Sequence, residues 1–245
     1  MTTHNTSLLI DGMSVSYAGK NAIREINLDI KEGEIFGLMG TNGAGKTTMI
    51  KAILGLRDQD QGQTSIFGEE RDAFRAKERL SYLPEKFEPP WFLTGFEFLK
   101  FSMKLYKQDF SKEKMIEVAE SLALDPAALG RRVHTYSKGM KQKLGLMATL
   151  LTGASLFILD EPMSGLDPMA RALVKKMISA MRDKEKTIFL SSHILADMDE
   201  LCDRVALLHG QTIQFVGSPA ELKKQTKAEN LELAFLHYIE KNIAA

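Results

Sequence analysis

The sequence has very little cysteine and no excess of charge. Cys202 is the only cysteine among 245 residues, so these residues can form no disulfide among themselves, which favours a reducing compartment. Lysine plus arginine equals aspartate plus glutamate at 32 each. A chain without net charge has no overall electrostatic reason to hold a polyanion. No nucleic-acid partner is therefore expected.

Long apolar runs are also missing. The longest stretch without a charged residue, 144–159, is shorter than the roughly 18 residues of a membrane span, and it contains Thr149, Thr152 and Gly153. The first residues show no basic segment followed by an apolar core, as a signal peptide would. Apolar residues make up 44% of the chain and charged residues 26%, as in ordinary globular domains. We expect a cytoplasmic protein that does not itself cross a membrane.

The clearest pattern is a phosphate-binding loop. Residues 40–47, Gly-Thr-Asn-Gly-Ala-Gly-Lys-Thr, match the spacing G-x-x-x-x-G-K-[ST], between an apolar strand at 34–39 and a helix start at 48–54. Such glycines let successive backbone N–H groups face an anion at a helix N-terminus. Lys46 can then reach the β- and γ-phosphates, and Thr47 can bring its hydroxyl to Mg²⁺. The nucleotide-binding residues of this stretch are Gly40, Asn42, Gly43, Ala44, Gly45, Lys46, Thr47 and Thr48.

A second pattern predicts hydrolysis of the bound nucleotide. Residues 155–160 form an apolar run that ends in Asp160, as in a parallel strand buried on both faces, and Glu161 follows at once. Asp160 can hold Mg²⁺ opposite Thr47. Glu161 can polarise a water for in-line attack on the γ-phosphate. A solvated strand end is the plainer alternative for an Asp-Glu pair, and the apolar residues before it argue against that.

The remaining patterns define the fold class. Alternating apolar positions predict strands at 8–17 and 22–30, and a helical pattern runs from about 94 to 151. Asp167 and Pro168 begin a helix as N-cap and first residue. We therefore predict an α/β P-loop NTPase core with an N-terminal antiparallel β portion and an inserted helical subdomain. Further strands are expected at 64–67, 80–83, 187–190, 204–209 and 212–216, and further helices at 194–202, 219–226 and 231–241.

Three more motifs follow in order: Tyr-Ser-Lys-Gly-Met at 136–140, Ser-Gly-Leu-Asp at 164–167, and His193 after an apolar strand. With the two patterns above, the whole chain resembles the nucleotide-binding subunit of an ATP-binding cassette (ABC) transporter. The resemblance implies a Walker A motif at 40–47, a Walker B motif at 156–161, a D-loop at 164–167 and a switch histidine at His193. It also implies one ABC ATPase domain, 1–245, with its core at 1–85 and 155–226, a helical subdomain at 86–154 and a C-terminal helix at 227–245.

The resemblance assigns further site residues. Tyr17 occupies the place of the aromatic residue that stacks on adenine, although it is also a simple strand aromatic. Ser137 and Gly139 belong to the signature that contacts the γ-phosphate held by the opposite subunit. Asp167 is a cross-dimer contact as well as a helix cap. Glu85 stands where the family has a glutamine that ligates Mg²⁺.

Two positions depart from the family pattern. The signature is Leu-Ser-Gly-Gly-Gln in the family, whereas this chain has Lys138 and Met140. Glu85 can ligate a metal as glutamine does, but it cannot donate a hydrogen bond. Both variations resemble those of ATPase subunits in the ABC-2 type export group.

The resemblance implies a Mg²⁺-dependent ATPase with Lys46, Glu161 and His193 as catalytic residues. Its partners would be a polytopic membrane permease and a second copy of itself, or a paralogue, in a nucleotide-sandwich dimer on the cytoplasmic face of the cell membrane. The alternative is a soluble ABC ATPase that moves no solute and acts in assembly or remodelling. A GTPase is disfavoured, because no Asn-Lys-x-Asp motif occurs. The aromatic stretch 91–101 either packs the helical subdomain or docks the membrane partner.

Overall fold

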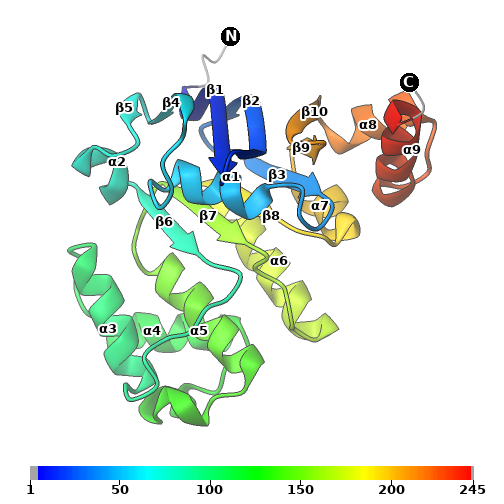
Figure 1. The fold of residues 1–245 in the computed structure, drawn as a ribbon. Coiled ribbons are helices and arrows are strands. Elements are labelled where there is room, and N and C mark those ends of the chain that lie inside the picture. The colour runs from blue at the N-terminus through cyan, green and yellow to red at the C-terminus, as the bar shows by residue number, and fades with distance from the viewer. Residues whose placement is uncertain (1–4, 244–245) are drawn as a thin grey trace.

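Two separate β-sheets organise the computed structural model, which describes residues 5–243 (Figure 1). The first sheet is antiparallel, in the order β2-β1-β4-β5. Its long strands alternate buried and exposed residues, as expected for a sheet that covers a core with one face. Its strands are β1 (Thr6–Tyr17), β2 (Lys20–Lys31), β4 (Gln61–Ile66) and β5 (Glu69–Glu70).

The second sheet has six strands in the order β10-β9-β3-β8-β7-β6. All its neighbouring pairs are parallel except β10 and β9, which form an antiparallel hairpin. Strands β3, β7 and β8 are buried along their whole length, because both faces of this sheet are covered. The strands are β3 (Ile35–Gly40), β6 (Leu80–Leu83), β7 (Leu156–Asp160), β8 (Thr187–Ser191), β9 (Arg204–His209) and β10 (Thr212–Gly217).

Alternate residues of the parallel strands pack in two different apolar cores, one on each face of the sheet. In β7, Leu156 and Ile158 pack in the core shared with the first sheet and helix α1 (Lys46–Ile53). Phe157 and Leu159 point to the opposite core, which contains the helices on the other side. This follows from the two-residue period of a strand. Helix α1 therefore lies between the two sheets, with the phosphate-binding loop at its N-terminus.

Most of the helices pack in the core that contains Phe157 and Leu159. Helices α3, α4 and α5 come between β6 and β7 in the chain and form the green region of Figure 1. Short polar side chains cap them: Thr94, Ser111 and Ser137 each accept a hydrogen bond from a backbone N–H of the first turn. The bounds are α2 (Phe74–Glu78), α3 (Gly95–Leu105), α4 (Lys112–Ser121), α5 (Lys138–Leu150), α6 (Pro168–Arg182), α7 (Leu195–Leu201), α8 (Pro219–Thr226) and α9 (Leu231–Ile243), with 3₁₀ turns η1 (Pro126–Gly130) and η2 (Val133–Thr135).

The predicted elements agree with the structure in kind, and two differ in extent. The helical pattern from 94 to 151 is three α-helices and two 3₁₀ turns, because the chain reverses at positive φ at Lys107 and Ala123. Strand β4 starts at Gln61, before the predicted 64–67, since Gln61 and Gln63 pair with β1 without supplying apolar residues. Among residues 5–243, no helix combines the length and the apolarity that crossing a membrane requires.

The parallel register brings the carboxyl ends of several strands together. Asp160 at the end of β7 lies opposite Ser191 at the end of β8, and Leu159 lies opposite Leu83 at the end of β6. Strand β3 ends beside them at Gly40, where the phosphate-binding loop begins. Ligands of open parallel sheets bind in the crevice outside this edge.

Candidate functional site

A cavity of about 560 Å³ opens at the carboxyl edge of the parallel sheet. Its walls come from segments far apart in the sequence: the end of β1, the phosphate-binding loop, and the residues that follow β6, β7 and β8. Most of the predicted site residues meet here. The cavity is lined by Tyr17, Ala22, Asn42, Gly43, Gly45, Lys46, Thr47, Thr48, Glu85, Asp160, Glu161 and His193.

Glycine is required at two positions of the loop. Gly45, the N-cap of α1, has a φ of 111°, and a Cβ there would lie 2.5 Å from Ile23 Cγ2 and 2.8 Å from the carbonyl oxygen of Ala22. A Cβ on Gly40 would lie 2.6 Å from the carbonyl oxygen of Leu208. A larger side chain would therefore force the loop away from β2 or β9. The glycines allow the loop backbone to lie at the N-terminus of α1, where backbone N–H groups can bind an anion.

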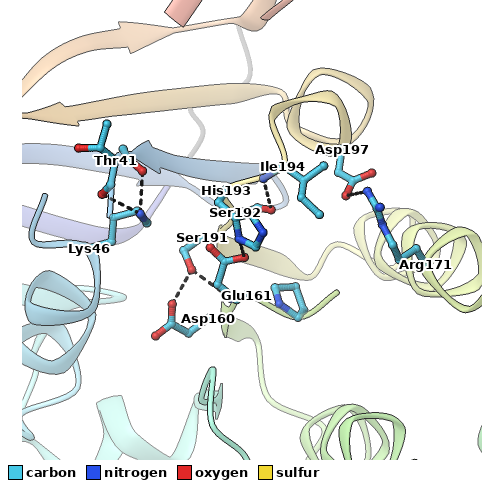
Figure 2. Close-up of polar contacts among 12 residues, drawn as sticks. Thr41, Lys46, Asp160, Glu161, Arg171, Ser191, Ser192, His193, Ile194 and Asp197 are labelled. Carbon is cyan, nitrogen blue, oxygen red and sulfur yellow. Dashed lines mark hydrogen bonds and ion pairs between the residues drawn. The ribbon is translucent and has the colours of Figure 1, made fainter. Parts of the chain in front are cut away.

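Lys46 folds back on the loop. Its ammonium group donates hydrogen bonds to the carbonyl oxygens of Gly40 at 2.7 Å and Thr41 at 3.2 Å (Figure 2). Burial lowers the pKa of Lys46, and the charges of Glu161, Asp160 and Glu85 oppose that effect. The lysine is thus held next to three carboxylates by contacts that a phosphate group can replace.

Asp160 has the features of a cation ligand. The side chain is buried, with 2% of its surface exposed, and Oδ1 accepts a hydrogen bond from Ser191 Oγ at 2.5 Å (Figure 2). Oδ2 is buried and has no hydrogen-bond partner among the described residues. Burial raises the pKa of Asp160 above its ordinary value. A buried carboxylate oxygen without a partner is costly unless a cation binds it.

The donor set fits Mg²⁺ held jointly with a nucleotide. Asp160, the hydroxyl of Thr47 and the carboxylate of Glu85 all line the cavity and are the hard oxygen ligands that Mg²⁺ takes. In the described part of the chain, no group of three or more His, Cys, Asp or Glu side chains could hold a metal by itself. Phosphate oxygens and water would complete the coordination, as is usual for Mg²⁺ in nucleotide sites.

Glu161 and His193 form a close pair. The Oε2 atom of Glu161 lies 2.7 Å from Nδ1 of His193 (Figure 2). Glu161 has a φ of 51°, an unfavourable conformation for a residue with a side chain, and its N–H donates to the backbone oxygen and the Oγ of Ser191. Burial raises the pKa of Glu161, and the neighbouring His193 opposes that rise. Strained backbone of this kind concentrates at functional sites.

Ser191 is a site residue that the sequence patterns did not single out. Its hydroxyl donates to Asp160 Oδ1 and accepts from the N–H of Glu161 at 3.1 Å. One side chain thereby contacts the carboxylate of Asp160 and the backbone of Glu161. Its position at the end of the strand next to β7 is the only signal in the sequence, and that signal requires knowing that β7 and β8 are neighbours.

A second unanticipated contact joins the helices behind the site. Arg171 on α6 donates to the buried carboxylate of Asp197 on α7 at 2.7 Å (Figure 2). Lys175, one turn further along α6, lies 3.7 Å from the same carboxylate. Helix α6 follows the segment 164–167 and α7 follows His193, so this ion pair fixes the two segments relative to each other.

Five predicted site residues do not line the cavity: Gly40 and Ala44 of the phosphate-binding loop, and Ser137, Gly139 and Asp167 at the starts of two helices. Ser137 caps α5 by accepting from the N–H of Met140 at 3.2 Å, and Gly139 lies in the first turn of that helix. Asp167 is exposed and caps α6 by accepting from the N–H of Ala170 at 2.9 Å. Its role as a helix cap is confirmed. Within one chain, none of these residues faces the cavity.

Comparison with known proteins gives consistent similarities. The family described as "ABC transporter" matches residues 23–164. A fluoroquinolones export ATP-binding protein of Mycobacterium tuberculosis is 36% identical over 221 residues, which cover 87% of this chain and 71% of that protein. A bacitracin transport ATP-binding protein of Bacillus licheniformis is 36% identical over 210 residues, covering 84% of this chain and 67% of that protein.

Other relatives are longer. An uncharacterized ABC transporter ATP-binding protein of Synechocystis is 37% identical over 205 residues, covering 82% of this chain but 58% of that protein. A solved structure described as the ATP binding subunit of an ABC transporter matches with a TM-score of 0.89 and 28% identity, covering 96% of this chain and 100% of the other. The predicted fold class is thereby confirmed.

Replacing Asp160 by Asn should raise the free energy of unfolding at neutral pH in the presence of EDTA. Because the raised pKa means that the folded protein holds this proton more tightly than the unfolded chain does, wild-type stability falls as the pH rises from the ordinary value of 3.8 through the folded value. The gain from Asn should grow across that window and then level off. Urea unfolding at a series of pH values measures it.

Asp167→Asn is the control of opposite sign. The N–H of Ala170 lowers the pKa of Asp167, so its contribution to stability is present above the unfolded pKa and is lost as the pH falls. An Asp160→Asn protein that is less stable than the wild type at neutral pH without metal would contradict the assignment of a destabilising buried carboxylate.

Proposed function

Because the chain belongs to the ABC transporter family, we propose that it binds ATP with Mg²⁺ and hydrolyses it to ADP and phosphate to power a separate membrane-spanning subunit. The observation that carries this proposal is the meeting of Lys46, Asp160 and the Glu161–His193 pair in one cavity beside the phosphate-binding loop. The names of the export and transport relatives support a transporter over a soluble assembly ATPase, and support export as the direction.

The residues divide the work of binding. The loop N–H groups and the α1 N-terminus hold the triphosphate, and Lys46 exchanges its contacts with the carbonyl oxygens of Gly40 and Thr41 for phosphate oxygens. Thr47, Asp160 and Glu85 would hold Mg²⁺, which neutralises charge on the phosphates. Tyr17 at the end of β1 would stack on the adenine base.

Glu161 is the general base of the proposed reaction. A carboxylate whose pKa is raised by burial accepts a proton more readily than an exposed one, provided that it stays ionised at the working pH. His193 at 2.7 Å and the two contacts of the Glu161 N–H with Ser191 limit the directions in which the carboxylate can point. The attacking water would therefore meet a base of fixed orientation, next to the phosphates held by the loop.

Glu161→Gln should leave ATP binding intact and reduce kcat by about 10²–10⁴-fold, because the amide keeps the size of the side chain but cannot take the proton. Glu34→Gln is a matched control: Glu34 is also buried, and its pKa is also raised by burial, but it does not line the cavity. Steady-state hydrolysis and equilibrium binding separate the two effects. Near-normal turnover by Glu161→Gln would reject this role.

The site proposed here needs a second subunit, which is another copy of the chain or a paralogue. Within one chain, the phosphate-binding loop and Lys46 supply the cavity with hydrogen-bond donors. Ser137 and Gly139 lie outside the cavity, at the exposed start of α5. The free N–H groups of that helix start suit an anion. A second chain whose α5 start faces this cavity would supply the missing contacts to the γ-phosphate, and Asp167 would lie at the same interface.

Mixing two inactive variants tests this arrangement. Lys46→Ala and Ser137→Arg should each lose ATPase activity as pure proteins, because each damages both composite sites of a dimer. A mixed dimer contains one doubly damaged site and one intact site, so partial activity should return on mixing. No recovery, together with a Glu161→Gln protein that remains monomeric with Mg²⁺ and ATP in size-exclusion chromatography, would contradict the shared site.

The membrane partner would dock on exposed aromatic residues before and within α3. Trp91, Phe92 and Phe101 are 66%, 55% and 54% exposed, whereas Phe98 in the same stretch is 8% exposed and packs in the core. The stretch thus packs the helical subdomain through Phe98, and the exposure of its other aromatic residues supports the docking role. Large exposed aromatic side chains are typical of interfaces. A polytopic permease bound here would keep the chain peripheral on the cytoplasmic face of the membrane.

Phe92→Glu should abolish co-purification with the permease subunit and leave basal ATPase activity unchanged, since a carboxylate cannot be buried unpaired in an apolar interface. Phe74→Glu is the matched control, because Phe74 is equally prominent at 68% exposed but lies on α2. Pull-down from detergent extracts of co-expressing cells measures both. Equal recovery of the permease with wild type and Phe92→Glu would place the docking surface elsewhere.

A further inference from the structure

Tyr17 has different neighbours on different sides of its ring. The side chain is 44% exposed and lines the cavity. The guanidinium carbon of Arg57 lies over the ring, 4.5 Å from its centroid, yet Arg57 does not line the cavity. Tyr17 thus contributes to the cavity wall, whereas the guanidinium that covers one face of its ring does not. We infer that Arg57 is a positioning residue for the nucleobase: it backs the ring of Tyr17 so that the opposite face is presented to adenine.

Arg57 is itself anchored to the strand that carries Tyr17. Its Nη2 atom donates to the carbonyl oxygen of Ser16, the residue before Tyr17, at 2.7 Å. The Nε atom is buried and has no hydrogen-bond partner among the described residues. A buried N–H group without an acceptor lowers the stability of the folded protein, because it has lost its hydrogen bonds to water. The contact with the ring is a place where this partly desolvated cation is stabilised, because cation–π attraction strengthens as water is excluded.

The same arginine is tied to the phosphate-binding helix. Its backbone N–H donates to the carbonyl oxygen of Lys51 on α1 at 3.2 Å, and its own carbonyl oxygen accepts from Arg71 Nη1 at 3.4 Å. Helix α1 begins at Lys46, within the phosphate-binding stretch 40–47. Arg57 therefore connects the element that holds the phosphates with the residue that meets the base. The connection sets the separation between the two ends of the nucleotide site.

Two physical effects follow from this placement. The guanidinium occupies one face of the ring, so a base can stack only on the other face. It also restricts rotation of an exposed tyrosine that would otherwise lose side-chain freedom when the nucleotide binds, and ordering before binding reduces that cost. Lysine cannot replace arginine fully here, since only the planar guanidinium can stack and donate in a fixed direction at once.

This inference rests on the proposed stacking of adenine on Tyr17, and the test separates the two. Binding of a non-hydrolysable ATP analogue, adenylyl imidodiphosphate, is compared with binding of inorganic tripolyphosphate, both with Mg²⁺, by calorimetry on the full chain. Arg57→Ala should weaken the ATP analogue by about two-fold to ten-fold, the range expected for one cation–π contact. Tripolyphosphate, which has no base, should bind as it does to the wild type. Arg57→Lys should show a smaller loss.

Two further variants complete the design. Arg79→Ala removes a guanidinium that stacks on Phe67 at 3.4 Å, away from the cavity, and should change neither affinity. Adding Arg57→Ala to Tyr17→Ala should cause no loss beyond that of Tyr17→Ala alone, because the arginine acts through the ring. This non-additivity is a result that a general loss of stability would not produce.

The possible results have distinct meanings. If Tyr17→Ala lowers the preference for the ATP analogue over tripolyphosphate and Arg57→Ala does not, the role of Arg57 is wrong and the stacking proposal stands. If neither variant changes that preference, both are wrong. If Arg57→Ala weakens both ligands equally, or adds a further loss to Tyr17→Ala, Arg57 supports the loop or the fold rather than the base. If Arg57→Ala does not fold, Arg57→Lys gives the same comparison.

Discussion

The structure depends on holding buried negative charge at the end of a parallel sheet. Asp160 and Glu161 are both buried where β7 ends, Glu85 lines the same cavity after β6, and Lys46 is the cation that faces them. Burial raises the pKa of Asp160 and Glu161, which means that the folded chain bears a free-energy cost for their ionised forms. A cation shared with a triphosphate, as proposed above, would reduce that cost. The same burial that disfavours these ionised carboxylates would favour the binding of a cation beside them.

Hydrogen bonds to Ser191, at the end of the neighbouring strand β8, hold Asp160 and Glu161 in place. Ser191 contacts Asp160 through its hydroxyl and Glu161 through both its hydroxyl and its carbonyl oxygen. The pairing of β7 with β8 therefore holds the carboxylate of Asp160, the proposed metal ligand, and the backbone of Glu161, the proposed base. The Arg171–Asp197 ion pair then joins α6 to α7. Helix α6 follows β7 in the chain, and α7 follows β8.

Much of the fold could be predicted because its signals are local. The buried apolar strands, the cap at Asp167, and the strand–loop–helix at 34–54 each follow from residues that are close to one another in the sequence. Polar stretches were harder: β4 extends to Gln61 because its pairing with β1 needs only backbone groups there. The breaks between α3, α4 and α5 depend on tight turns at Lys107 and Ala123, residue types that carry no turn signal of their own. The domain boundaries remain a prediction.

The sequence by itself determined the phosphate-binding loop, because the spacing of its glycines, Lys46 and Thr47 already contains the local geometry that an anion needs. It also determined which carboxylates end a buried strand. Only the tertiary structure decided that Ser191 contacts Asp160, that Glu161 contacts His193, and that Arg57 lies over the ring of Tyr17. Asp160 and Ser191 are 31 residues apart in the sequence, and Glu161 and His193 are 32 residues apart. Their contacts arise from strand order and register, which no local pattern of residues specifies.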